Sequence, residues 1–567
     1  MERCYHHCTT RTLWTTAPKI EGMVANQAFT AWFSALAQGK KQLPKMLWQS
    51  GSLPCRTCGC PNATLCPNFP SCKSDDDVSA WPLVFGEASG GGPRATTLLL
   101  DVRVYGAVAD NATDCTSAIE AALAAAAAAV VPATVVLPGP GIYVSGPLLL
   151  NNSVRLTLRI EADATLASAG IELAELGRWP IISDLYPANV HPPGAGRPGV
   201  YSPILHLLNC TDLIIEGGGT LDGRGQGGWW QSVTYAVRIK SPNASCPNPK
   251  CRGCQGSCPS RPRLFLTENS RFISLTNVTF KNSPFWTTHF YNSSDVHISG
   301  LRVENPAGGP NASSPIAFVQ KYGYGPNADG IDVEHTQRVL IENCNIRCGD
   351  DAICLKAGFT RSALPPTLDV LARRNRIHSS CPHIPGLNVP PTANANDGCG
   401  GMKFGYGTHS GIANVLFEDT QVDFAGVAIK LSSHLGEGGP LRNITFKGTT
   451  ITKAGIAVNV NLGTTPKTNL SQLSSLDGLS IVDLSAEDSI GCLSIVRPGD
   501  YCAGAGCLIG SKHQALGNIT LRNVSISSRD RKAAGIGWLC DDASSVTATG
   551  VAPAVCKTTA PFICSET

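Results

Sequence analysis

Apolar residues recur along the chain in pairs of short strand-like segments. Each copy reads apolar, any, apolar, two further positions, small or apolar, any, apolar, so alternation of period two continues on both sides of a corner. The clearest copies are Ile273-Leu275-Val278-Phe280, Val296-Ile298-Leu301-Val303, Val339-Ile341-Cys344-Ile346, Ile444-Phe446-Thr449-Ile451 and Ile519-Leu521-Val524-Ile526. Looser copies begin at Leu213, Val370, Val415 and Leu479. Successive copies start 23 residues apart at the closest, and further apart where loops intervene.

This repeat predicts the coils of a parallel β-helix. A one-residue corner between two strands, recurring at irregular intervals, is typical of solenoid coils. A sandwich would instead place tight hairpin turns between adjacent strands. The segments 241–262 and 360–396 are long insertions, and we expect them to project from one rim, where insertions often line a binding face.

The N-terminal half of the chain predicts a helix and a boundary. The Ala-rich segment Cys115–Ala128 carries Ile119 and Leu123 on one face, and we expect this helix to cap the open end of the sheet. The first 95 residues lack sustained periodicity and are rich in Cys, Pro, Ser and Gly. We therefore expect three parts, which are a Cys-rich irregular N-terminal region (1–95), a parallel β-helix domain (96–545) and a Cys-containing C-terminal tail (546–567).

Composition agrees with a turn-rich β protein. The 567 residues include 58 Gly and 39 Pro, with only 15% charged and 6% aromatic residues. The net charge of +3 does not indicate a nucleic-acid or membrane partner. The sequence contains no run of about 18 or more apolar residues, so we expect no membrane span.

The 24 cysteines favour an oxidising compartment. Their even number and their loop-rich surroundings are typical of disulfides. The spacings Cys55-x-x-Cys58 and Cys251-x-x-Cys254 also resemble zinc ligands. We favour disulfides because neither cluster contains a matched pair of such arms.

Glycosylation acceptor patterns also indicate a secretory route. The N-x-Ser/Thr pattern occurs at Asn62, Asn111, Asn151, Asn209, Asn243, Asn277, Asn292, Asn311, Asn443, Asn469, Asn518 and Asn523. The opening residues MERCYHHCTTRTLW nevertheless contain no apolar core of signal-peptide type.

Three acidic side chains between Asn327 and Lys356 are the candidate chemistry. Asp329 precedes the pair Asp350 and Asp351 by 21 residues, and small residues surround both clusters. If one coil is roughly 20 to 30 residues long, this spacing stacks the second cluster on the first. Gathered carboxylates suit hydrolysis of a glycosidic bond, because one protonated group releases the leaving oxygen and one ionised group activates water. The alternative is that each is an ordinary acidic surface turn.

Longer segments resemble a known family. The entry segment YGAVADNATDCTSAIEAAL is followed by GGGTLDGRGQGGWW (Gly217–Trp230), RPRLFLTENS (Arg261–Ser270) and NSPFWTTHF (Asn282–Phe290). From about Asp101 to Ser527 the chain resembles glycoside hydrolase family 28, the polygalacturonases and related pectin hydrolases. The family motifs N-T-D, D-D, G-H-G and R-I-K stand here as Asn327-Ala328-Asp329, Asp350-Asp351, Gly398-Cys399-Gly400 and Ala428-Ile429-Lys430.

The resemblance implies an all-β fold and a mechanism. The fold is a right-handed, single-stranded parallel β-helix, a pectin-lyase-like solenoid, and hydrolysis proceeds by single displacement with inversion. Asp350 matches the general acid, and Asp329 with Asp351 matches the pair that holds and deprotonates water. Three carboxylates so close cannot all ionise cheaply, so one should keep its proton. An inverting pair is expected roughly 6.5 to 9.5 Å apart. Neither metal nor cofactor is required.

Five further residues are candidates for substrate binding: Asn327, Lys356, Cys399, Gly400 and Lys430. Lys430 matches the family residue that meets the sugar carboxylate. Two positions depart from the motifs, because Cys399 replaces the His of G-H-G and Ala428 replaces the Arg of R-I-K. The guanidinium fork suited to a carboxylate is therefore lost. Cys399 is expected either in the subsite or, alternatively, buried or disulfide-bonded.

We therefore expect a monomeric extracellular or cell-wall hydrolase whose partner is a pectin-type polysaccharide. One alternative is a related hydrolase with rhamnogalacturonan or neutral-sugar specificity, which Cys399 and Ala428 favour. Another is a carbohydrate-binding β-helix without turnover. A β-helix lyase fits less well, because it would use calcium and a basic residue instead of an acid and water.

Overall fold

The computed structural model describes most of the chain beyond residue 96. The described residues are 97–183, 185, 199–230, 261–308, 311–358, 364–380, 399–405, 407–434, 438–464, 474–489, 505–510, 516–527, 537–541, 543 and 545–556. The expected N-terminal region (1–95) and most of the expected insertion 241–262 lie outside them.

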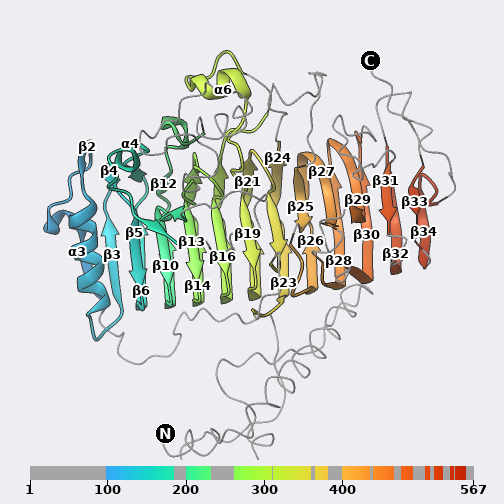
Figure 1. Cartoon of the computed structure of the whole chain (residues 1–567), viewed down its shortest axis with the longest axis horizontal. Helices are drawn as coiled ribbons and strands as arrows, with labels where there is room; N and C mark the ends of the chain where they lie inside the picture. The colour runs from blue at the N-terminus through green and yellow to red at the C-terminus, as the bar shows by residue number, and fades with distance from the viewer. Residues whose placement is uncertain are drawn as a thin grey trace, which may run out of the picture. The chain divides into compact units, whose positions relative to one another are not determined.

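Strands stack in three parallel ladders, whose order along the long axis follows the chain (Figure 1). The first ladder pairs, in sequence, β1 (Leu98–Asp101), β3 (Ala133–Leu137), β6 (Val154–Ile160), β11 (Thr211–Glu216), β14 (Arg271–Thr276), β17 (Ser294–Ser299), β20 (Gln337–Glu342), β23 (Thr367–Arg373), β26 (Ile412–Glu418), β28 (Pro440–Ile451), β30 (Ser475–Ala486), β32 (Gly517–Ile526) and β34 (Val546–Ala552). The second pairs β2 (Asp110–Asp114), β4 (Gly141–Ser145), β7 (Ala164–Ser168), β12 (Thr220–Asp222), β15 (Thr279–Lys281), β18 (Arg302–Glu304), β21 (Asn345–Cys348), β24 (Arg376–Ser379) and β27 (Gln421–His434).

The third ladder carries the residues that matter for function. It pairs β5 (Leu148–Asn151), β10 (Leu205–Leu208), β13 (Phe265–Glu268), β16 (Thr288–Tyr291), β19 (Ile331–Glu334), β22 (Ile353–Lys356), β25 (Gly400–Phe404), the second half of β27, β29 (Ala454–Thr464), β31 (Gly506–Ile509) and β33 (Leu539–Asp541). Successive coils add one strand to each ladder, which is the architecture of a parallel β-helix.

The apolar repeat of the sequence is the stacked core of this helix. Parallel pairing aligns Leu213, Ile273, Val296, Val339, Val370, Val415, Ile444, Leu479 and Ile519 in one row. Each of these side chains is at most 1% exposed. The predicted coils are therefore confirmed, looser copies included. The segment 360–396, expected to be a rim insertion, contains β23 and β24, so that expectation was wrong for its central part.

The one-residue corners are left-handed. From β14 onward, one residue per coil between the first and second ladders has φ between 49° and 68°: Asn277, Gly300, Asn343, Arg374, Asp419, Gly448, Asp483, Asn523 and Gly550. This conformation strains most side chains, but glycine adopts it freely and asparagine and aspartate tolerate it. Eight of these nine corner residues are accordingly Asn, Asp or Gly, and Arg374 is the exception.

Several glycosylation acceptor patterns coincide with such positions. Seven of their asparagines have positive φ: Asn111, Asn209, Asn277, Asn292, Asn443, Asn518 and Asn523. An Asn turn followed two residues later by a strand Thr or Ser produces the N-x-Ser/Thr pattern without any sugar. Part of the pattern thus has a structural cause.

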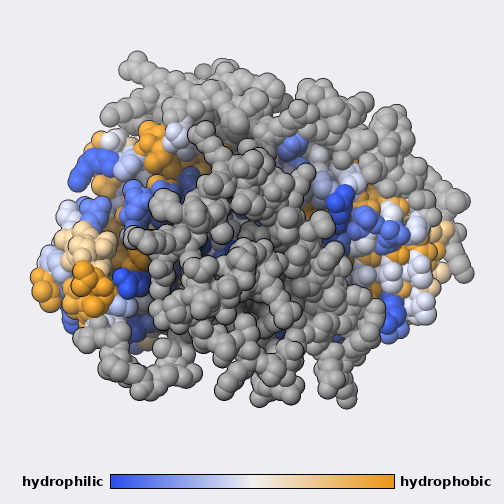
Figure 2. Space-filling model, turned by 90° about the horizontal axis from the view of Figure 1, so that it is seen from below, coloured by the Kyte–Doolittle hydropathy of each residue, from blue (hydrophilic) through white to orange (hydrophobic). Residues whose placement is uncertain are grey.

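The helices lie at the ends and edges of the ladders. The predicted helix is α3 (Thr116–Ala127), which lies at the N-terminal end of the stack (Figure 1). It buries Ile119 and Leu123, as expected. The other short elements are η2 (Val102–Tyr105), α4 (Glu172–Glu175), η3 (Gly225–Gly227), α6 (Ala317–Tyr322) and the antiparallel pair β8 (Ile181–Ile182) and β9 (Val200–Tyr201). Figure 2 shows hydrophobic surface beside hydrophilic surface at the end that carries α3.

The ladder continues past residue 545, where we expected the C-terminal tail to begin. β34 pairs with β32, so residues 546–552 form part of the last described coil. A disulfide joins Cys540, on β33, to Cys556, which follows β34 in the chain. Among the described residues, no helix is both long and apolar enough to cross a membrane.

Replacing the exposed corner residue Asn277 tests the role of the left-handed conformation. Asn277→Gly should leave the midpoint of thermal unfolding nearly unchanged, because glycine adopts φ 50° freely. Asn277→Val should lower the free energy of unfolding by about 1–2 kcal/mol, because a branched side chain strains this conformation. Equal midpoints for both variants, expressed in a host that adds no N-glycans, would contradict the corner assignment.

Candidate active site

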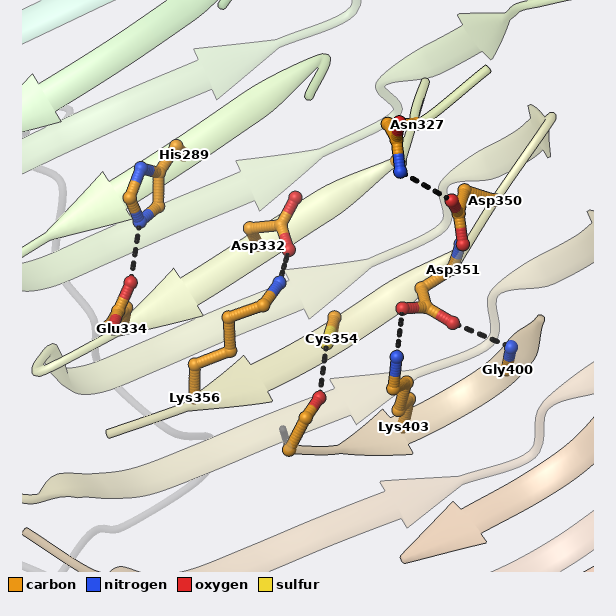
Figure 3. A network of polar contacts seen from close by, with 12 residues as sticks. His289, Asn327, Asp332, Glu334, Asp350, Asp351, Cys354, Lys356, Gly400 and Lys403 are labelled. Atoms are coloured by element: carbon orange, nitrogen blue, oxygen red, sulfur yellow. Dashed lines mark hydrogen bonds and ion pairs between the residues drawn. The ribbon is translucent and has the colours of Figure 1, made fainter. Parts of the chain in front are cut away.

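Register between coils brings the three predicted aspartates together. Asp329 lies on the turn before β19, and Asp350 and Asp351 lie on the turn before β22. The Gly330 N–H donates to the Asp351 carbonyl at 2.8 Å, which aligns the two turns. One carboxylate oxygen from each aspartate lies within 4.8 Å of the others. The predicted stacking is confirmed, and Figure 3 shows Asp350 and Asp351 beside the polar contacts of neighbouring strands.

Two neighbouring N–H groups fix the carboxyl of Asp350, while its buried surroundings favour the protonated form. The side-chain amide of Asn327 donates to Asp350 Oδ2 at 3.1 Å, and the Asp351 N–H donates to Oδ1 at 3.0 Å. Burial, followed by the charge of Asp351, raises the pKa of Asp350 to about 7. This carboxyl can therefore be protonated under mildly acidic conditions.

Asn327 orients this acid. Its backbone has φ 51°, and its Oδ1 accepts a hydrogen bond from Arg261 Nη2 at 2.8 Å. Arg261 Nη1 in turn donates to the carbonyl oxygens of Pro284 and Pro326 at 2.6 and 2.7 Å. The amide predicted to bind substrate thus connects a buried guanidinium to Asp350.

Asp351 is the ionised member of the cluster. The Gly400 N–H donates to its Oδ1 at 2.7 Å, and Lys403 Nζ donates to its Oδ2 at 2.5 Å. Burial by itself would raise the pKa of Asp351, but the ammonium groups of Lys403, Lys430 and Lys356 outweigh burial and lower it. Gly400, also predicted to bind substrate, therefore positions a carboxylate.

Asp329 has a buried carboxyl oxygen, Oδ1, that no described residue satisfies. Its residue is 3% exposed, and burial, followed by the charges of Asp350 and Asp332, raises its pKa well above the ordinary value. Among the described residues, no hydrogen-bond partner reaches Asp329 Oδ1. A buried acceptor of this kind ordinarily binds water or a ligand.

Lys356 pairs with Asp332 across adjacent strands. The two side chains are 5% and 0% exposed, and the ammonium lies 4.0 Å from the centre of the Trp286 ring. Burial raises the pKa of Asp332 to about 6 despite this partner. Lys356, predicted to bind substrate, therefore contacts protein groups, while its charge still acts on Asp351.

Cys399 follows the second of its two expected alternatives, because it is buried and disulfide-bonded, and Ala428 is buried as well. Cys399 is 2% exposed and disulfide-bonded, and its sulfur lies 3.2 Å from Asp350 Oδ1. Since a disulfide sulfur carries no proton, it donates nothing to that oxygen. Ala428 is fully buried in the main apolar core. Lys430 remains half-buried and in register with Lys403.

Sequence reasoning missed Lys403, Asp332 and Arg261. Lys403 alternates with the buried Met402 and Phe404, so it shares the outer face with Lys430. That alternation was readable, but its register with Asp351 was not. Asp332 lies on β19, three residues after Asp329. Its acidic side chain could be read from the sequence, but its pairing with Lys356 could not.

Protein donors already balance much of the acidic charge. A spacing of 4.8 Å among three carboxylate oxygens also suits a cation. Both oxygens of Asp351, however, accept hydrogen bonds from Gly400 and Lys403. The donor set therefore fits proton chemistry better than metal chelation.

Three carboxyls gathered on a parallel β-helix can supply the acid and the base that hydrolysis of a glycosidic bond requires. Residues 201–494, just over half of the chain, match the family described as glycosyl hydrolases family 28. The chain belongs to this family and is a glycosidase.

Relatives and solved structures agree with this assignment. A probable polygalacturonase of Vitis vinifera is 25% identical over 437 residues, covering 74% of this chain and 73% of that protein. The exopolygalacturonase of Thermotoga maritima has a TM-score of 0.56 and 20% identity, covering 81% of this chain and 93% of its own. The Erwinia carotovora polygalacturonase has a TM-score of 0.53 and 17% identity, covering 82% and 98%. The predicted right-handed parallel β-helix is confirmed.

Gly400→Ala tests how closely Asp351 must be held. A Cβ at Gly400 would lie 2.6 Å from Lys403 Cβ and 3.3 Å from Asp351 Oδ1, so the two carboxylate contacts must shift. We expect glycosidase kcat to fall about a hundredfold, the cost of roughly 1 Å of misplacement. The matched control is Gly227→Ala, because a Cβ there meets nothing within 4 Å. Wild-type kcat in Gly400→Ala would show that this contact is unimportant.

Proposed function

We propose that the chain hydrolyses a pectin-type, galacturonan-like polysaccharide by single displacement with inversion. The observation that carries the proposal is the gathering of one oxygen from each of three carboxyls within 4.8 Å, with Asp351 held by Gly400 and Lys403. Asp351 has a lowered pKa, whereas burial and neighbouring charge raise the pKa of Asp350 to about 7. The relatives named polygalacturonase support the substrate class.

The reaction assigns one task to each aspartate. Asp350 gives its proton to the glycosidic oxygen as the bond from that oxygen to the anomeric carbon breaks. A water molecule, held by Asp329 Oδ1, attacks the anomeric carbon from the opposite face, and Asp351 takes its proton. The unsatisfied Asp329 oxygen supports the water position. Because Asp351 is the ionised group, it is the base, and Asp329 holds the water.

The spacing of the carboxylates bears on the stereochemistry. One oxygen of each carboxyl lies within 4.8 Å of one oxygen of the others, closer than the roughly 6.5 to 9.5 Å expected for two facing carboxyls. The site contains three groups on adjacent turns, two of them chain neighbours, so the two-carboxyl rule does not transfer directly. The proposal of inversion therefore rests on the resemblance to family 28 and on the water position beside Asp329 Oδ1.

Lys430 supports recognition of an acidic sugar. It matches the family's carboxylate-binding lysine, and its charge reaches the cluster, since it lowers the pKa of Asp351. The disulfide between Cys540 and Cys556 supports an extracellular or cell-wall location.

A product assay tests the function. Purified protein is incubated with polygalacturonate, rhamnogalacturonan and a neutral glucan, with and without chelator. We expect new reducing ends from polygalacturonate, no unsaturated product and no chelator effect, with the inverted anomer seen first by NMR. New ends only from another polymer would overturn the substrate, an unsaturated product the reaction type, and a retained anomer the mechanism.

Asp350→Asn should abolish turnover and spare binding. Removing the proton donor costs about a hundredfold or more in kcat, while the amide keeps the size of the carboxyl. Affinity for oligogalacturonate, measured by calorimetry, should stay within a few-fold of wild type. Asp423→Asn, an outer-face carboxyl paired with Arg376, is the matched control. Unchanged kcat in Asp350→Asn would remove this residue from the acid role.

The pH dependence of kcat/KM should be bell-shaped with its maximum in the mildly acidic range. Activity requires Asp351 ionised and Asp350 protonated. The lowered pKa of Asp351 keeps it ionised down to low pH, and the Asp350 pKa of about 7 makes activity fall as pH rises through that value. A single rising limb that extends well above pH 7 would contradict the assignment of Asp350.

A further inference from the structure

Lys403 has a place in the site that the family motifs do not provide. It lies on β25, between the buried core residues Met402 and Phe404, so strand alternation sends its side chain to the outer face. There its ammonium donates to Asp351 Oδ2 at 2.5 Å, and the two side chains are only 10% and 4% exposed (Figure 3). This is a desolvated, charge-assisted contact, not a surface ion pair.

The surroundings of Asp351 make that contact consequential. Titratable groups surround Asp351 from several coils. The preceding coil contributes Asp329 and Asp332, and the coil of Asp351 itself contributes Asp350, Cys348, Cys354 and Lys356. The following coils contribute Lys403 and Lys430. Lys356 forms its ion pair with Asp332. Lys403 donates directly to Asp351 Oδ2, and the charge of Lys430 also lowers the pKa of Asp351. The carboxylate that must be ionised is thus held by Lys403.

Two motif positions that carry cations in the family do not carry them here. Position 399 is a disulfide-bonded half-cystine, and position 428 is an alanine in the core. Position 403, five residues after the start of the altered G-H-G motif, supplies a positive charge from the neighbouring strand instead.

We propose that Lys403 is a positioning residue of the hydrolysis. Resting on the function proposed above, it orients Asp351 and keeps it ionised, so that Asp351 takes the proton of the attacking water while Asp350 retains its own. Lys403 does not bind the substrate carboxylate in this role. The lowered pKa of Asp351, in which Lys403 is the foremost stabilising charge opposing burial, agrees with the geometry.

The test compares Lys403→Met, which removes the charge, with Lys403→Arg, which keeps it. In Lys403→Met the acid limb of the kcat/KM profile should move up by about one pH unit or more, because an unpaired buried carboxylate binds its proton more tightly. The loss should appear in kcat at mildly acidic pH, with KM changed far less. Lys403→Arg should restore the limb toward wild type. Lys447→Met is the matched control, since Lys447 pairs with Glu418 at 3.2 Å on another ladder.

Two kinetic outcomes would overturn the proposal. In both, the acid limb of the kcat/KM profile of Lys403→Met does not move. If KM is unchanged as well, Lys403 has no role in the reaction, and if KM is raised, Lys403 is a substrate-binding residue.

A second readout does not depend on activity. The pair stabilises the fold where Asp351 is ionised, and this contribution is lost as pH falls through the lowered pKa of Asp351. The difference in unfolding midpoint between wild type and Lys403→Met should therefore be larger near pH 7 than at a pH well below 3.8, the ordinary pKa of an aspartate, where Asp351 is protonated in both proteins. If wild type releases no reducing ends, the proposed function fails. The midpoint comparison still decides whether Lys403 keeps Asp351 ionised. A pH-independent difference would overturn it.

Discussion

The hydrogen-bonded register between successive coils is the constraint on which the site depends. Main-chain bonds such as Gly330 N–H to Asp351 and Ala352 N–H to Gly400 fix each turn above the next. Residues 329, 351 and 400 are far apart in sequence, yet the register makes them neighbours. A slip of one residue would turn every side chain of a strand to the opposite face. The buried apolar rows prevent that slip, so core packing and catalytic geometry share one cause.

Register also arranges charge on the outer face of the third ladder. His289 bonds Glu334, Asp332 pairs with Lys356, and Asp351 pairs with Lys403, each pair joining one coil to the next (Figure 3). The side chains of these pairs are almost wholly buried. A buried charge is costly without a partner, so each carboxylate depends on a donor from the following coil or the preceding one. The face is therefore a set of coupled pairs in which burial raises some pKa values and ammonium groups lower others.

The sequence predicted the coils well because their signal is local. Each copy of the repeat, with its period-two alternation and its corner residue, fits within ten positions of the sequence. Even the loose copy at Val370 lies in the stacked row. The three aspartates were also predicted, since their spacing equals one coil. Contacts that cross coils were less accessible. The partner of Lys356 is Asp332 and that of Lys403 is Asp351, and both follow from a register that insertions of variable length conceal.

The altered motif positions 399 and 428 show that cations near the carboxylate cluster have two separate tasks. One task is to balance charge within the carboxylate cluster, and Lys403 fits it because its ammonium is buried against Asp351. The other is to receive the carboxylate of the sugar, for which a guanidinium fork is better suited than an ammonium point charge. With Ala428 in the core and Cys399 in a disulfide, this chain has Lys403 for the first task and lacks the cations that the family motifs carry at positions 399 and 428. Turnover and preference for acidic sugars should therefore vary independently among chains with this pattern, because different cations determine them.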